Sequence, residues 1–109
     1  MIDWDRVEEL RHEVGEDDFA EVVELFLEEV DDTIARLGHS DANASLEEQL
    51  HFLKGSALNI GFNEFARLCQ DGETAAALGH AETVDLAAIS TAYGAARAQF
   101  LLENKSRYA

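Results

Sequence analysis

Apolar residues recur along this chain at spacings of three and four, a pattern that predicts amphipathic α-helices. The longest stripe begins at Phe19 and continues through Val23, Phe26 and Val30 to Leu37. No alternating pattern of the kind that predicts β-strands is present. Together with capping signals, the stripes predict helices over about residues 3–14, 18–37, 46–59, 63–78 and 83–106.

Glycines and small polar residues mark the ends of these helices. Gly15 follows the first stripe and is expected to terminate its helix. Ser45 and Glu48 have the spacing of a capping box at the start of the third helix, and Asp18 with Glu21 resembles one at the start of the second. These signals place the predicted boundaries close to the ends of the apolar stripes.

The predicted fold is all-α. Short connections between successive helices favour antiparallel neighbours. The last four helices are therefore expected to form an antiparallel up-down-up-down four-helix bundle, with an additional short N-terminal helix that carries Trp4 across one end or side. The length of 109 residues fits a single domain, 1–109.

Composition narrows the classes of protein to consider. The chain is 47% hydrophobic, contains no proline, and has no apolar run near the roughly 20 residues that span a membrane. The N-terminus lacks the basic start and apolar core of a signal peptide, so a cytoplasmic location without a membrane is expected. The single cysteine, Cys69, excludes an internal disulfide framework and is expected to pack in the core.

The net charge of −15 argues against a nucleic-acid partner, because phosphate binding needs clustered lysine and arginine. The first 50 residues hold 17 of the 23 acidic residues. Two interpretations remain open: a solvated acidic surface, or electrostatic steering toward a partner with a basic patch.

His51 has an unusual setting on the third predicted helix. At 100° per residue, it points away from the apolar arc in which Phe52 and Leu53 lie. The neighbours of His51 on its own face are Lys54 and Gly55, at i+3 and i+4. A residue at i+4 normally shades residue i, but glycine leaves that space open. An exposed imidazole beside a cation and an open space suits the arrival of a large anionic group.

The run His51-Phe52-Leu53-Lys54-Gly55-Ser56-Ala57, followed by Gly61 and by Ala66-Arg67-Leu68-Cys69, resembles the signature of histidine-containing phosphotransfer (HPt) domains. The resemblance covers roughly residues 47–73, and the preceding helix also fits that family. It implies that His51 is the phosphorylated residue, Lys54 the nearby cation and Gly55 the space-making glycine. Several members carry a glutamine four residues after the cysteine. Here Glu73 stands there, and an acid is expected to repel a phosphohistidine.

The resemblance implies a phosphorelay carrier that takes a phosphoryl group from one receiver-domain aspartate and passes it to another. The partners would be receiver domains of hybrid histidine kinases or of stand-alone response regulators. Mg²⁺ would belong to the receiver, so no cofactor or metal of this chain's own is expected. The carrier would not be an enzyme with its own turnover, and a monomer is expected.

The docking surface is expected around Leu58, which shares the face of His51. Phe19 and Val23 either extend this apolar patch or belong to the core. Lys54 could also pair with Glu47 or Glu48 on its own helix, and that pairing is compatible with a role beside His51. The alternative functions are a non-phosphorylated acidic adaptor and a regulator that docks kinase domains.

Overall fold

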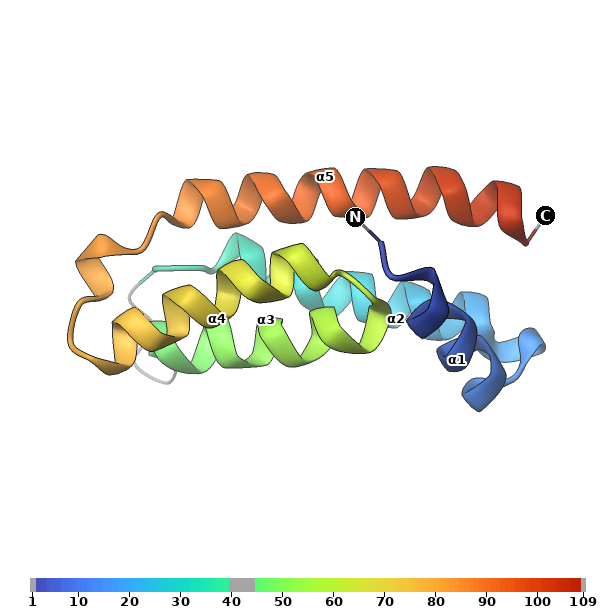
Figure 1. Ribbon diagram of the computed structural model, residues 1–109, viewed down its shortest axis with the longest axis horizontal. Helices are drawn as coiled ribbons and strands as arrows, with labels where there is room; N and C mark the ends of the chain where they lie inside the picture. The colour runs from blue at the N-terminus through green and yellow to red at the C-terminus, as the bar shows by residue number, and fades with distance from the viewer. Residues whose placement is uncertain (1, 40–44, 109) are drawn as a thin grey trace.

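The computed structural model describes residues 2–39 and 45–108, and Figure 1 shows their arrangement. The described residues form helices and no strands. A single turn of 3₁₀ helix, Ala81–Thr83, precedes the last helix. The α-helices are α1 (Trp4–Val14), α2 (Glu16–Ala35), α3 (Leu46–Ile60), α4 (Asn63–Ala77) and α5 (Leu86–Arg107).

Helices α2 to α5 alternate in direction along the long axis of the molecule, and α1 folds over one end (Figure 1). This arrangement confirms the predicted up-down-up-down bundle with an additional N-terminal helix. The largest side chains in the core with almost no exposed surface are Phe62, Phe100, Leu50, Leu53, Val7 and Cys69. None of the helices in the described ranges is long and apolar enough to cross a membrane.

Helix α3 is capped at both ends as its sequence predicts. The Ser45 hydroxyl accepts a hydrogen bond from the backbone N–H of Glu48 at 3.1 Å. Gly61 ends the helix in the left-handed conformation, with a φ of 83°. A Cβ at Gly61 would lie 2.6 Å from the carbonyl oxygen of Asp3, so the tight turn between α3 and α4 also requires glycine for space.

Two predicted helix starts were wrong. Helix α2 begins at Glu16, so Asp18 lies within the helix and is not its cap. The carbonyl of Gly15 accepts the N–H of Asp18 at 3.2 Å, which starts the helix without a side-chain cap. Helix α5 begins at Leu86 rather than near Thr83, because the Asp85 side chain accepts the N–H of Ala88 at 3.0 Å.

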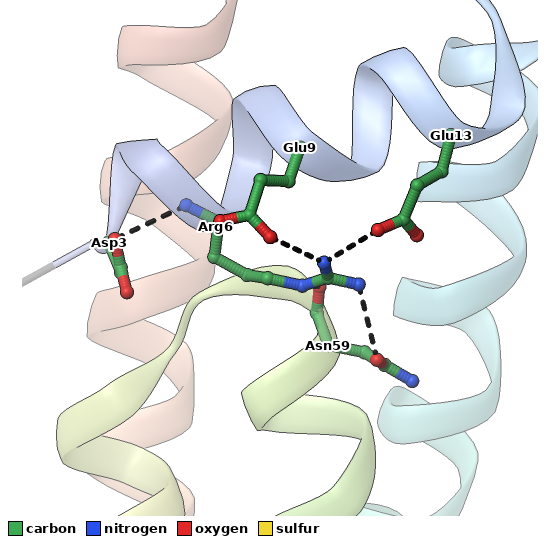
Figure 2. Close-up of polar contacts among 5 residues, drawn as sticks. All are labelled: Asp3, Arg6, Glu9, Glu13 and Asn59. Carbon is green, nitrogen blue, oxygen red and sulfur yellow. Dashed lines mark hydrogen bonds and ion pairs between the residues drawn. The ribbon is translucent and has the colours of Figure 1, made fainter.

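Helix α1 is fastened to the C-terminal end of α3. The Arg6 guanidinium donates to the backbone carbonyl of Asn59 at 3.0 Å and pairs with Glu13 and Glu9 at 3.0 and 3.3 Å. Figure 2 shows this cluster at the junction of the two helices. Trp4 stacks on Phe100 of α5, with ring centroids 5.5 Å apart. These contacts hold α1 across the end of the bundle and fix the end of the helix that carries His51.

Candidate functional site

His51 lies on the outer face of α3, as the helical spacing predicts. Its side chain is 69% exposed, whereas Leu50, Leu53 and Ala57 on the opposite face are buried. One face of α3 therefore anchors the helix in the core, and the other presents the imidazole to solvent.

Glu73 of α4 holds the inner nitrogen of the imidazole. Its Oε2 atom lies 2.8 Å from His51 Nδ1, and its Oε1 atom lies 2.9 Å from Lys54 Nζ. The contact with Lys54 is the largest cause that lowers the pKa of Glu73; burial opposes it, and the hydrogen bond with His51 lowers the pKa further. Glu73 is therefore a carboxylate at neutral pH, flanked by a lysine and a histidine.

An ionised carboxylate can only accept a hydrogen bond, so the proton of a neutral imidazole must sit on Nδ1, which faces Glu73. The outer nitrogen, Nε2, then carries the free lone pair and is the ring's nucleophilic atom. The repulsion expected between Glu73 and a phosphohistidine stays a prediction. Lys54 lies 2.9 Å from Glu73, so the charges of this acid and this lysine compensate each other at the site.

Lys54 turns toward α4 rather than toward Glu47 or Glu48 of its own helix. Besides its ion pair with Glu73, the ammonium donates a hydrogen bond to Gln70 Oε1 at 2.8 Å. The Lys54 side chain is only 21% exposed, so its aliphatic part is covered while its charge meets α4.

Gly55 leaves an open space beside His51. A Cβ built on Gly55 would meet no neighbouring atom within 4 Å. Gly55 is not one of the glycines with a positive φ, so its backbone conformation is one that any residue can adopt. Nothing within the fold requires glycine at this position, and its open space faces outward, where a partner could fill it.

Exposed apolar side chains surround this face, although they are not all the ones predicted. Leu58 is 50% exposed, as expected. Phe52, placed in the buried arc by its spacing, is 40% exposed. It lies at the edge of that arc and lines a shallow groove between α2 and α3, together with Thr33 and Gln49.

The expectation that Phe19 and Val23 extend the docking surface was wrong. Both side chains are only 5% exposed, because they lie on the stripe of α2 that faces the core. The outward apolar residues of α2 are instead Leu25, which is 53% exposed, and the partly buried Val22 and Phe26. Phe26 and Val22 lie on or beside the apolar stripe, so the pattern alone did not predict their partial exposure. Leu25 lies about 120° or more from Phe19, Val23, Leu27 and Val30, so its exposure could have been predicted.

The remaining histidines and the cysteine offer no competing site. His12, His39 and His80 are exposed, and the residues that the structure describes include no cluster of three metal-ligating side chains. Cys69 is fully buried, and burial raises the pKa of its thiol to about 12. Cys69 therefore packs in the core, as predicted.

Comparison with known protein families gives one match. The model of a family described as the Hpt domain matches residues 21–100, which include α3, α4 and most of the bundle. Comparisons with curated proteins and with solved structures found no match. The matched segment contains His51, Lys54, Gly55 and Glu73, whereas α1 lies outside it.

Proposed function

Because this chain belongs to the Hpt domain family, whose members take part in histidine phosphotransfer in phosphorelay signalling, we propose that His51 is its phosphorylated residue. In this proposal, His51 accepts a phosphoryl group from the aspartate of one receiver domain and passes it to a second receiver. One observation carries the assignment: the His51 ring is exposed, and its Nδ1 atom is held by Glu73 while Nε2 points away from that contact.

Transfer begins with a neutral imidazole. The lone pair on Nε2 attacks phosphorus in line, the P–O bond to the receiver aspartate breaks, and the aspartate leaves as a carboxylate. The Nδ1 proton stays in place, so positive charge develops on the ring as the N–P bond forms. Glu73 Oε2, at 2.8 Å from Nδ1, stabilises that charge. The same steps in reverse deliver the phosphoryl group to the next receiver.

Lys54 contributes in two ways. Its ammonium lowers the pKa of the Glu73 carboxyl and holds the carboxylate in place, and it adds positive charge beside the phosphoryl oxygens as a point charge. The site is consequently neutral before the phosphoryl group arrives, within a chain of net charge −15. Mg²⁺ and most catalytic groups are assigned to the receiver, and this chain supplies the positioned nucleophile and a docking face.

The docking face consists of Gly55, Leu58 and Phe52 on α3, with Leu25 on α2. The three apolar side chains are 40–53% exposed, and Gly55 provides the open space. A carrier must release each partner, so the interface is expected to be small and transient. The adaptor alternative would gain support if His51 were buried or capped by a neighbouring side chain. Glu73 contacts Nδ1, but the side chain is 69% exposed and Nε2 lies away from that contact, which favours the carrier over the adaptor.

The test is incubation of the protein with phosphorylated receiver domains. Label should move to this chain and should survive base but not acid, as a phosphoramidate does. His51→Gln should abolish the labelling with the helical circular dichroism unchanged, whereas His12→Gln and His80→Gln should retain it. Labelling of the His51→Gln protein at the normal level would refute the assignment.

A further inference from the structure

A chain of hydrogen bonds continues from the site along α4. Gln70 and Thr74 lie one turn apart on this helix, where side chains at i and i+4 are neighbours. Gln70 Nε2 donates to the Thr74 hydroxyl at 3.0 Å, and Gln70 Oε1 accepts from Lys54 Nζ at 2.8 Å. The amide oxygen thus faces the cation and the amide nitrogen faces the hydroxyl, so both ends of the amide meet a complementary group.

The Lys54 ammonium has two partners on α4. Its Nζ atom lies 2.9 Å from the buried Oε1 atom of Glu73 and 2.8 Å from Oε1 of Gln70. An ammonium carries three N–H donors, so the ion pair with Glu73 and the hydrogen bond to Gln70 can form together. Gln70 therefore supplies a second polar partner at the place where the ammonium meets Glu73.

We infer that Gln70 is a positioning residue for the phosphotransfer site: it holds the Lys54 ammonium against Glu73, and Thr74 holds Gln70 in the required orientation. This inference rests on the proposed function of His51. A lone ion pair near the surface is weak, and a lysine side chain loses much rotamer freedom when it is held. The hydrogen bond to Gln70 is the second anchor that keeps the ammonium over α4.

The effect reaches His51 through Glu73. When the ammonium leaves for solvent, Glu73 is still a carboxylate at neutral pH, but it loses the ion pair at 2.9 Å that holds its position against His51. The Nδ1 contact then weakens, and a larger fraction of the neutral imidazole carries its proton on Nε2. That tautomer has no lone pair on the outer nitrogen and cannot attack phosphorus.

The experiment compares Gln70→Met, which keeps the length of the side chain but lacks the amide, with Thr74→Val, which keeps its shape but lacks the hydroxyl. Thr91→Val, at an exposed position of α5, is the matched control. Carbon-13 NMR of the free protein should show a higher pKa for the Glu73 carboxyl in Gln70→Met, a smaller rise in Thr74→Val and no change in Thr91→Val. Nitrogen-15 NMR should show a loss of the Nδ1–H tautomer of His51 in the same order.

Phosphotransfer provides a second readout. From a phosphorylated receiver, the transfer rate within the complex should fall about three- to tenfold for Gln70→Met, with receiver affinity changed less than twofold. An unchanged Glu73 pKa and an unchanged His51 tautomer in Gln70→Met would overturn the inference. A changed tautomer with an unchanged transfer rate would overturn its functional part. The NMR measurements need no receiver, so they remain decisive even if His51 proves not to be phosphorylated.

Discussion

Substitution of Gly55 should separate stability from phosphotransfer. An alanine Cβ at this position would meet nothing within 4 Å, and Gly55 is not among the glycines with positive φ, so alanine adds no strain. Alanine in a helix interior is favoured over glycine by about 0.5–1 kcal/mol. For a chain of 109 residues, Gly55→Ala should therefore raise the melting temperature by about 2 to 6 °C.

The opposite effect on transfer is expected for a longer side chain. In Gly55→Gln, the side chain at i+4 leans toward the N-terminus and covers His51. A receiver must displace it, against rotamer freedom worth up to about 2 kcal/mol. The transfer rate should consequently fall about tenfold, which corresponds to about 1.4 kcal/mol.

Gly94 provides a matched control within the same chain. It also lies inside a helix, α5, and a Cβ there would also meet nothing within 4 Å. Gly94→Ala should raise the melting temperature as Gly55→Ala does, whereas Gly94→Gln should leave transfer unchanged. Thermal unfolding by circular dichroism and rapid-quench transfer assays measure both effects. Equal transfer rates for Gly55→Gln and Gly94→Gln would refute the argument that Gly55 clears space for the phosphoryl group.

Two further predictions concern the surface and the core. Leu58→Asp should weaken receiver binding by at least about 1 kcal/mol in a titration, since the apolar centre of an interface dominates its affinity. Leu78→Asp, at a 71% exposed position near the end of α4, should leave receiver binding unchanged. Equal losses of affinity in the two variants would place the docking surface elsewhere. Cys69 should resist thiol reagents in the native protein, because it is fully buried and burial raises the pKa of its thiol to about 12. The rate of its labelling should follow the rate of unfolding, and rapid labelling without denaturant would contradict its place in the core.

The arrangement of the helices could be predicted from the sequence because long amphipathic stripes leave few alternatives. The stripe on α2 includes the buried Val23, Leu27 and Val30, so its core face was well determined. The ends were less certain because several residues can start a helix. Three acidic residues, Glu16–Asp18, follow Gly15, and any of them fits a first turn. In the structure, the helix begins at Glu16 because the backbone carbonyl of Gly15 accepts the first hydrogen bond, from the N–H of Asp18.

The docking surface could be predicted only in part, because exposure at the edge of an apolar stripe depends on the neighbouring helix. Leu58 lies far from the centre of the buried arc of α3, so its exposure follows from the sequence. Phe52 lies near the margin, where the distance between α2 and α3 determines whether the ring is covered. The sequence contains no measure of that distance. Phe19 and Val23 differ from Phe52, because they lie on the apolar stripe of α2 itself and the pattern favoured their burial.

Glu73 shows why the effect of a departure from a family pattern depends on the residues that contact it in the fold. An acid beside a phosphohistidine is unfavourable as an isolated pair, but Glu73 is separated from Lys54 by 19 positions and contacts it only after α3 and α4 pack together. The lysine then cancels the added charge, and the carboxylate fixes the Nδ1 proton more strongly than a neutral amide would, because hydrogen bonds to charged groups are the stronger ones. The same substitution without the lysine would place an uncompensated anion beside His51, where the proposed function has the phosphoryl group bind. Glu73 and Lys54 are therefore best understood as one unit, which lets a strongly acidic chain hold a neutral site at His51.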